Sequence, residues 1–178
     1  MEYIKTEIDG LWIIEPLVFT DERGYFMESY KKVEFEQKIG KVNFIQDNES
    51  KSSFGVLRGL HYQEGEMSQA KLVRVIQGQV WDIAVDIRKG SATFGKYVAV
   101  ELSEENKRQF FISRGFAHGF LVLSGTAVFS YKVDNIYSPA HERAINCMDP
   151  DLAIQWPLDQ SLMRLSEKDQ KGKLLKEI

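Results

Sequence analysis

Cysteine is almost absent from this sequence of 178 residues, in which Cys147 stands alone. A single cysteine can form neither an internal disulfide nor a cysteine-based metal cluster. Long apolar stretches are missing too, because no segment reaches the ~18 apolar residues that a membrane-spanning helix needs. Residues 1–9 carry charges where a signal peptide would have an apolar run. We therefore expect a cytoplasmic protein that has no membrane partner.

A strong excess of charge of one sign is also missing. The formal net charge is −3, so nothing in the composition indicates a protein that binds nucleic acid or a membrane surface. A few local arginines could still hold an anion of nucleotide size. Hydrophobic residues make up 43% and charged residues 28% of the chain, as in an ordinary globular protein. The length suits one full core, so we expect a single domain over residues 1–178.

Short stretches of strand-forming residues are what the sequence has in abundance. Glycines and polar turns separate them, and they cover residues 11–14, 17–19, 25–30, 42–46, 71–76, 79–88, 97–102, 109–112, 117–123 and 127–133. Many short strands at close spacing predict an all-β antiparallel sandwich or barrel. The Gln77-Gly78 pair predicts a hairpin between its two flanking strands. The polar residues 47–53 follow the strand expected at residues 42–46.

Two segments depart from the strand pattern. Residues 31–39 carry a modest apolar stripe and are followed by Gly40, which predicts a short helix with a glycine C-cap. Near the end of the chain, Ser166 and Asp169 have the spacing of a capping box. We expect a lysine-rich helix to begin there and to reach Glu177.

The stretch GVLRGLHYQ at residues 55–63 combines a cation, a titratable imidazole and two glycines within one expected strand. Gly59 has no packing role inside a strand, so it indicates a β-bulge or a close approach by a ligand. Arg58 and His61 would face opposite sides of a regular strand. If both serve one site, the alternation must break near Gly59. The alternative is that His61 is a buried, hydrogen-bonded histidine of a barrel core.

Seven motifs occur in an order and at spacings that resemble one family. They are FTDERGYF at 19–26, QDN at 46–48, VLRGLHYQ at 56–63, KLVR at 71–74, GFAHGF at 115–120, YK at 131–132 and LSEKD at 165–169. Together they resemble the dTDP-4-dehydrorhamnose 3,5-epimerase family over roughly residues 4–170. One departure is Ser113, which stands where the family often has proline. The resemblance implies a jelly-roll (cupin-type) β-barrel, usually dimeric, that needs no metal or other cofactor.

The implied reaction sets clear chemical requirements. The substrate is a 4-keto-6-deoxyhexose carried on dTDP, and its C3 and C5 hydrogens are both alpha to the ketone. Inverting each centre requires a base on one face and an acid on the other. A cation or hydrogen-bond donor must also stabilise the enolate charge at the C4 oxygen.

The resemblance assigns four catalytic roles. His61 matches the base, since a neutral imidazole accepts a proton near neutral pH. Asp169 matches the carboxylate that orients this ring, although by spacing it is equally a helix-capping acid. Lys71 matches the residue at the C4 oxygen, with a solvated lysine as the alternative. Tyr131 matches the acid, with an aromatic core residue as the alternative.

Further positions match contacts to the nucleotide sugar. Arg23 and Arg58 match diphosphate contacts, which guanidinium groups suit geometrically. Tyr137 matches an aromatic that stacks on the thymine base. The remaining matches, to the nucleotide or the sugar, are Glu28, Gln46, Asp47, Asn48, His118, Glu142 and Lys168. Arg23 and Glu28 are candidates for the neighbouring subunit's site in a homodimer.

Three alternatives remain open from the sequence. A metal-dependent cupin needs about three histidines and a carboxylate around one ion, and such a site would use all three histidines of this chain. An epimerase that inverts only C3 or only C5 would require similar residues. A non-catalytic nucleotide-sugar-binding barrel would keep the arginines and aromatics but would not need His61, Lys71, Tyr131 and Asp169 together.

Overall fold

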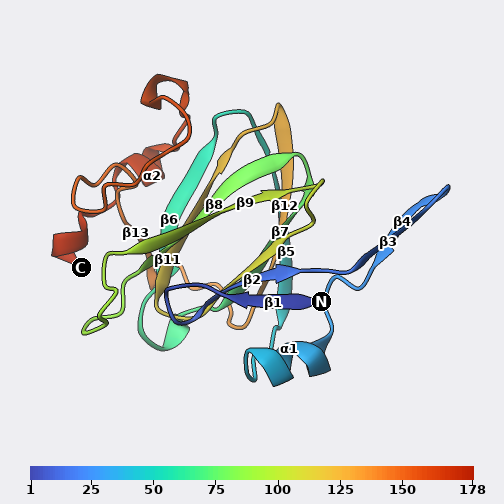
Figure 1. Cartoon of the computed structure of the whole chain (residues 1–178). Helices are drawn as coiled ribbons and strands as arrows, with labels where there is room; N and C mark the ends of the chain where they lie inside the picture. Colours follow the sequence, from blue (N-terminus) through green and yellow to red (C-terminus); the bar gives the residue numbers. More distant parts are fainter.

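Two antiparallel sheets face each other in the computed structural model, which describes residues 1–178. The six-stranded sheet has the order β1-β2-β10-β7-β12-β5 and the five-stranded sheet the order β13-β6-β11-β8-β9. The strands are β1 (Glu2–Lys5), β2 (Leu11–Glu15), β3 (Val18–Asp21), β4 (Gly24–Met27), β5 (Gln46–Ser53), β6 (Leu57–Gln63), β7 (Lys71–Gln77), β8 (Gln79–Asp86), β9 (Tyr97–Ser103), β10 (Gln109–Ile112), β11 (Phe116–Val122), β12 (Thr126–Val133) and β13 (Glu142–Ala144). This arrangement confirms the all-β jelly-roll prediction (Figure 1).

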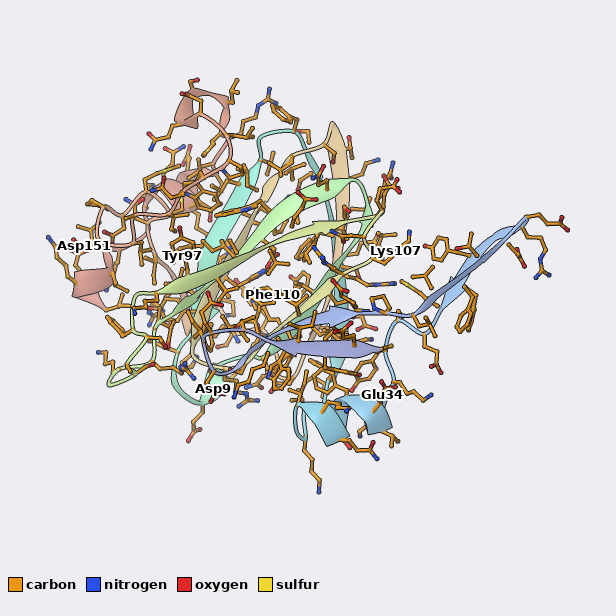
Figure 2. All side chains as sticks on the ribbon, viewed as in Figure 1. Asp9, Glu34, Tyr97, Lys107, Phe110 and Asp151 are labelled. Atoms are coloured by element: carbon orange, nitrogen blue, oxygen red, sulfur yellow. The ribbon has the colours of Figure 1, made fainter.

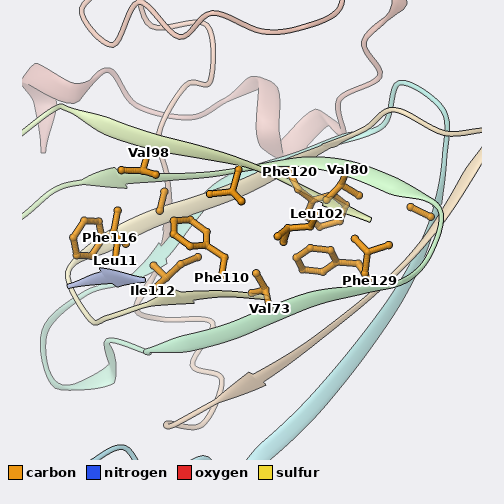
Figure 3. Close-up of a cluster of buried hydrophobic side chains, with 14 of the residues drawn as sticks. Leu11, Val73, Val80, Val98, Leu102, Phe110, Ile112, Phe116, Phe120 and Phe129 are labelled. Atoms are coloured by element: carbon orange, nitrogen blue, oxygen red, sulfur yellow. The ribbon is translucent and has the colours of Figure 1, made fainter. Parts of the chain in front are cut away.

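The main core fills the space between the two sheets (Figure 3). Phe129 of β12 stacks on Phe120 of β11 with ring centroids 4.2 Å apart, so aromatic rings join the sheets. Phe110 and Leu102 are fully buried beside them. Close packing of this kind makes the barrel interior rigid. It provides a firm support for any side chain that projects inward from the same strands.

Two smaller apolar clusters cover the outer faces of the sheets. The C-terminal segment from Ile145 onward packs Leu152 and Leu175 against the outer face of the five-stranded sheet. Helix α1 (Lys32–Lys38) confirms the predicted first helix and buries Phe35 against Phe111 of the six-stranded sheet. None of the helices combines the length and the apolar composition that a bilayer crossing would require.

The predicted hairpin at Gln77-Gly78 is wrong. β7 and β8 are consecutive in sequence, but β7 pairs with β10 and β12 while β8 pairs with β9 and β11. The chain therefore crosses from one sheet to the other at Gly78. A Cβ there would lie 2.1 Å from the carbonyl oxygen of Thr126, so the glycine is required by a close backbone approach at this corner and not by a tight hairpin.

The strand predicted at residues 42–46 is also wrong, apart from Gln46. Residues 42–45 are not a strand, whereas the polar segment Gln46–Ser53 forms the eight-residue strand β5 at the edge of the six-stranded sheet. It pairs with β12 along its whole length. Most of its side chains are exposed, so they need not be apolar. Strand propensity failed here because tertiary pairing decides the structure.

The C-terminal helix is much shorter than expected. α2 covers only Glu167–Gln170, with Ser166 as its N-cap, and a separate 3₁₀ turn follows at Leu175–Glu177. Gly172 lies between these two elements, and a Cβ on it would lie 2.6 Å from the backbone of Ile145 and Asn146. The requirement for close contact with the barrel therefore ends the helix before its lysine-rich part.

A hairpin formed by β3 and β4 leaves the barrel as an arm, and we name residues 18–27 the arm (Figures 1 and 2). Its turn confirms the predicted turn at residues 21–24. Phe19 and Phe26 are 56% and 67% exposed at the arm's surface. Their ring centroids are 6.5 Å apart, and neither residue belongs to an apolar cluster of the barrel. An arm with this much exposed aromatic surface is typical of an interaction surface.

Candidate active site

A β-bulge in β6 gives the central stretch its geometry. His61 pairs with His118 and Arg58 with Phe120, so three steps along β6 oppose two along β11. Gly59 has φ +118°, and a Cβ on it would lie 2.6 Å from Gly119 Cα and from the His118 carbonyl oxygen. The bulge prediction is therefore confirmed, and the close approach at Gly59 is made by the neighbouring strand. The extra residue lets Arg58 and His61 project to the same side of the strand.

A pocket of about 320 Å³ lies beside this bulge, where the apolar core ends. Polar side chains of the two facing sheets and of their loops dominate it. The residues that line it are Gln46, Asn48, His61, Tyr62, Gln63, Gln69, Lys71, Tyr131, Tyr137 and Glu142. A pocket with several convergent polar groups is the usual form of a small-molecule site.

His61 and Asp169 form a hydrogen-bonded pair at the pocket wall. The distance between His61 Nε2 and Asp169 Oδ1 is 2.5 Å. The carboxylate is buried, whereas the imidazole side chain is 28% exposed toward the pocket. Burial by itself raises the pKa of Asp169, but hydrogen bonds from His61 and Ser166 hold it below the ordinary value. The carboxylate therefore stays ionised and can stabilise a protonated imidazole.

The two alternatives for Asp169 turn out to be compatible. Its backbone N–H donates to Ser166 Oγ at 3.2 Å, as a helix cap does, while Ser166 Oγ donates to Asp169 Oδ2 at 2.8 Å. The other carboxylate oxygen is left for His61. One aspartate thus closes the first turn of α2 and orients the imidazole.

Lys71 and Tyr131 face the pocket from the opposite sheet. Lys71 begins β7, Tyr131 is in β12, and the Lys71 Nζ lies 6.0 Å from the centre of the Tyr131 ring. Burial lowers the pKa of Lys71 to about 8, against the attraction of Asp82 and Glu142. Burial raises the pKa of Tyr131, so its phenol keeps its proton at neutral pH. The pocket therefore has a cation and a proton donor across from His61.

Several predicted binding residues meet at the pocket mouth. Tyr137 donates a hydrogen bond from its hydroxyl to Glu142 Oε2 at 2.6 Å, and Lys168 forms an ion pair with the same oxygen at 2.5 Å. Burial alone raises the pKa of Glu142, but these two contacts lower it overall. Gln46 and Asn48 add amide groups from β5.

Other predicted residues lie outside the pocket lining. Arg58 donates to Ser52 Oγ at 3.0 Å on the inner side of β5. Asp47 lies on the outer face of β5 and pairs with Lys132 at 2.8 Å, because alternation turns it away from Gln46 and Asn48. Arg23 lies in the arm and pairs with Asp21, whereas Glu28 pairs with Lys31 just after the arm. The structure therefore does not bring Arg23 and Glu28 to the pocket of their own chain.

His118 lies beneath the pocket rather than in it. Its Nε2 lies 3.0 Å from both carboxylate oxygens of Asp82, a fully buried residue of β8. Burial lowers the pKa of His118. The third histidine, His141, bonds through Nδ1 to Ser138. No group of three or more histidine, cysteine or acidic residues is arranged to hold a metal ion.

Sequence reasoning missed Tyr62, Gln63 and Gln69, which line the pocket, and the fully buried Asp82. The sequence did contain an indication of Asp82. It is an acidic residue inside a strand, on the same face as Ala84, and the other face of that strand is apolar. Gln63 ends one of the quoted motifs but carries no local pattern that indicates a role.

A scan against family models matches residues 5–177 to dTDP-4-dehydrorhamnose 3,5-epimerase. The chain belongs to this family. The epimerase of Shigella flexneri is 57% identical over 173 residues, which cover 97% of this chain and 94% of that protein.

Solved structures of this epimerase family agree closely with the fold. The crystal structure of the epimerase from Elizabethkingia anophelis has a TM-score of 0.96 and 54% identity, and covers 99% of this chain and 97% of that one. A 3,5-epimerase from Legionella pneumophila, in complex with dTDP-4-keto-L-rhamnose, has a TM-score of 0.96 and 53% identity. That match covers 99% of this chain and 94% of the other.

Proposed function

We propose that this protein is a dTDP-4-dehydrorhamnose 3,5-epimerase. It converts dTDP-4-dehydro-6-deoxy-D-glucose to dTDP-4-dehydro-L-rhamnose in the biosynthesis of dTDP-L-rhamnose. The observation that carries the proposal is the pair His61–Asp169 on one wall of a pocket whose opposite wall presents Lys71 and Tyr131. The relatives described above are named as epimerases of this reaction, and the structure of one of them contains dTDP-4-keto-L-rhamnose.

The residues divide the reaction between the two sheets. His61 removes the C3 or C5 proton from one face of the sugar, and Asp169 stabilises the imidazolium that results. The Lys71 ammonium stabilises the negative charge that develops on the C4 oxygen. Tyr131 then delivers a proton from the other face. Each round leaves His61 protonated and Tyr131 deprotonated, and proton exchange with solvent restores both residues before the second round. Two rounds invert both centres, and no step uses a metal or another cofactor.

The remaining residues bind the nucleotide part. Arg58 holds the diphosphate, Tyr137 stacks on the thymine, and the amides of Gln46 and Asn48 match the donors and acceptors of the base. Glu142 and Lys168 complete the contacts around the sugar, and the buried His118 supports the pocket from beneath through its contact with Asp82. Asp47 acts indirectly, through its ion pair with Lys132 at the edge of β5.

We further propose that the protein works as a homodimer, with each arm reaching a neighbouring subunit. The exposed Phe19 and Phe26 support this, and so does the absence of Arg23 and Glu28 from the lining of their own pocket. Each arm would then add Arg23 and Glu28 to the partner subunit's site. A sedimentation equilibrium mass near the 20.5 kDa of one chain would contradict this. A cytoplasmic location stays a prediction.

Product analysis by ¹H NMR tests the proposed function. Incubation with dTDP-4-dehydro-6-deoxy-D-glucose should yield inversion at both C3 and C5, and a coupled 4-keto reductase would trap the unstable product. We expect the same turnover after dialysis against EDTA, since none of the proposed steps uses a metal. Inversion at one centre only would indicate a single-centre epimerase. Loss of activity with EDTA would indicate a metal-dependent cupin instead.

The pH dependence of turnover should report on Lys71. Its pKa of about 8 lies below the usual 10.5 because of burial, so the ammonium is present below that pH and lost above it. We expect kcat/KM to fall as the pH rises through about 8. Lys71→Arg keeps its charge at every accessible pH, so any residual activity of this variant should lack that decline. A wild-type profile that stays flat well above pH 8 would contradict the role of Lys71.

A further inference from the structure

The side chain of Tyr137 lines the pocket without being packed into an apolar cluster. Tyr137 is 54% exposed. The only hydrogen bond of its side chain is the one to Glu142. Packing therefore does not fix where the ring stands, and its position depends on the backbone of the loop that carries it, residues 134–141.

The side-chain amide of Gln63 brackets Tyr137 on both sides. Gln63 Nε2 donates to the carbonyl oxygen of Ile136 at 3.0 Å, and the backbone N–H of Ser138 donates to Gln63 Oε1 at 2.6 Å. These are the residues immediately before and after Tyr137. Gln63 is only 7% exposed and is the last residue of β6, so the amide projects from a rigid strand.

The same amide also reaches a second loop over the pocket, residues 64–70. Its Nε2 donates to the carbonyl oxygen of Met67 at 2.6 Å. Other polar side chains join the two loops nearby: Gln69 Nε2 donates to the Asn135 carbonyl at 2.7 Å, and Asn135 Nδ2 donates to the Glu66 carbonyl at 2.9 Å. These hydrogen bonds tie the two loops to each other and to the end of β6.

Only an amide satisfies all three partners of Gln63. Two backbone carbonyls need N–H donors and one backbone N–H needs an acceptor, and a glutamine side chain offers two donors and an acceptor in one plane. A carboxylate would keep the acceptor but place a negative oxygen against both carbonyls. Buried groups left without a partner in this way are costly.

We propose that Gln63 is a positioning residue that sets the place of Tyr137 at the mouth of the pocket. This inference rests on the proposed function, in which Tyr137 stacks on the thymine base of the substrate. Gln63 fixes the backbone on both sides of Tyr137 and so presents the ring, pre-oriented, to the base. Its effect on the nucleotide is exerted through Tyr137.

A double-mutant cycle with dTDP binding as the readout tests this. We expect Gln63→Glu to weaken dTDP binding about tenfold, the scale of one or two lost hydrogen bonds, and to raise KM more than it lowers kcat. Tyr137→Ala should weaken binding through loss of the stacked ring. If Gln63 acts through Tyr137, the double variant should bind no more weakly than Tyr137→Ala alone.

Two further measurements separate positioning from a general structural effect. In Gln63→Glu the dTDP affinity should recover as the pH is lowered, because a protonated carboxyl group again donates to a carbonyl. Gln155→Glu is the matched control, since Gln155 Nε2 also donates to a backbone carbonyl, that of Ala153 at 3.1 Å, in an exposed turn away from the pocket. It should change neither affinity nor the melting temperature.

The outcomes are distinct. Additive losses in the cycle would show that Gln63 touches the ligand independently of Tyr137, and would overturn the inference while leaving the proposed function intact. A Gln63→Glu variant that unfolds, with Gln63→Met behaving alike, would assign Gln63 to stability and overturn it as well. A wild-type protein that neither binds dTDP nor epimerises the keto sugar would overturn both the inference and the proposed function.

Discussion

His61→Ala is expected to lower kcat by roughly 10⁴-fold or more, at or beyond the upper end of what loss of a general base costs. The reason is that His61 is the one residue proposed to remove both protons, so two successive steps lose their base. The neighbouring Asp169 cannot replace it, because its carboxylate is buried behind the imidazole and engaged by Ser166. Steady-state turnover of the keto sugar measures the effect.

Binding of dTDP to His61→Ala is the control for this experiment. The groups proposed to hold the nucleotide, among them Arg58 and Tyr137, do not depend on the imidazole, so calorimetry should give an affinity close to that of the wild type. A variant that keeps near wild-type turnover would make His61 a histidine of structural importance only. A variant that loses dTDP binding as well would indicate a disrupted pocket instead of a missing base.

Tyr131→Phe is expected to separate proton removal from inversion. The substitution removes one hydroxyl and about 1 kcal/mol of hydrogen bonding at most, so the barrel should fold normally. His61 can still form the enolate, with Lys71 stabilising its oxygen. Without the phenol, His61 returns the proton to the face from which it came. In D₂O the variant should therefore incorporate deuterium at C3 and C5 while it forms little inverted product.

The comparison with His61→Ala makes the assignment specific. That variant should neither exchange nor invert, because no enolate forms. Inversion of both centres by Tyr131→Phe at a normal rate would show that another group, such as Tyr137 or a bound water, is the acid. Equal loss of exchange and inversion would show that Tyr131 acts in binding or in forming the enolate. Mass spectrometry and NMR of the recovered sugar distinguish these results.

The sequence predicts which residues meet at the pocket better than the path of the chain around it. The bulge at Gly59 follows from an odd spacing and a misplaced glycine, and both are local features. The crossing at Gly78 and the strand nature of β5 are not local, because they depend on which strands become neighbours. A polar segment such as residues 46–53 becomes a strand only once β12 is beside it.

The placement of individual site residues also depends on which segments become neighbours in the fold. Gln46 and Asn48 face the pocket while Asp47 does not, and this alternation becomes predictable only when residues 46–48 are known to be extended. The importance of Gln63 depends on two loops that are distant in sequence, so no pattern near residue 63 could indicate it. The dual contact of Asp169 arises because α2 packs beside β6, 108 residues away in the chain.

The hydrogen bond between His61 and Asp169 makes the C-terminal segment part of a linked equilibrium. Residues 145–178 dock on the five-stranded sheet through Leu152 and Leu175, and only the docked state has a complete histidine–aspartate pair. A ligand that prefers the complete pair therefore stabilises the docked segment by mass action. Conversely, any change that undocks the segment in a fraction of the molecules lowers the apparent affinity in proportion to the competent population. Apolar contacts on the outside of the barrel are in this way thermodynamically coupled to chemistry inside it.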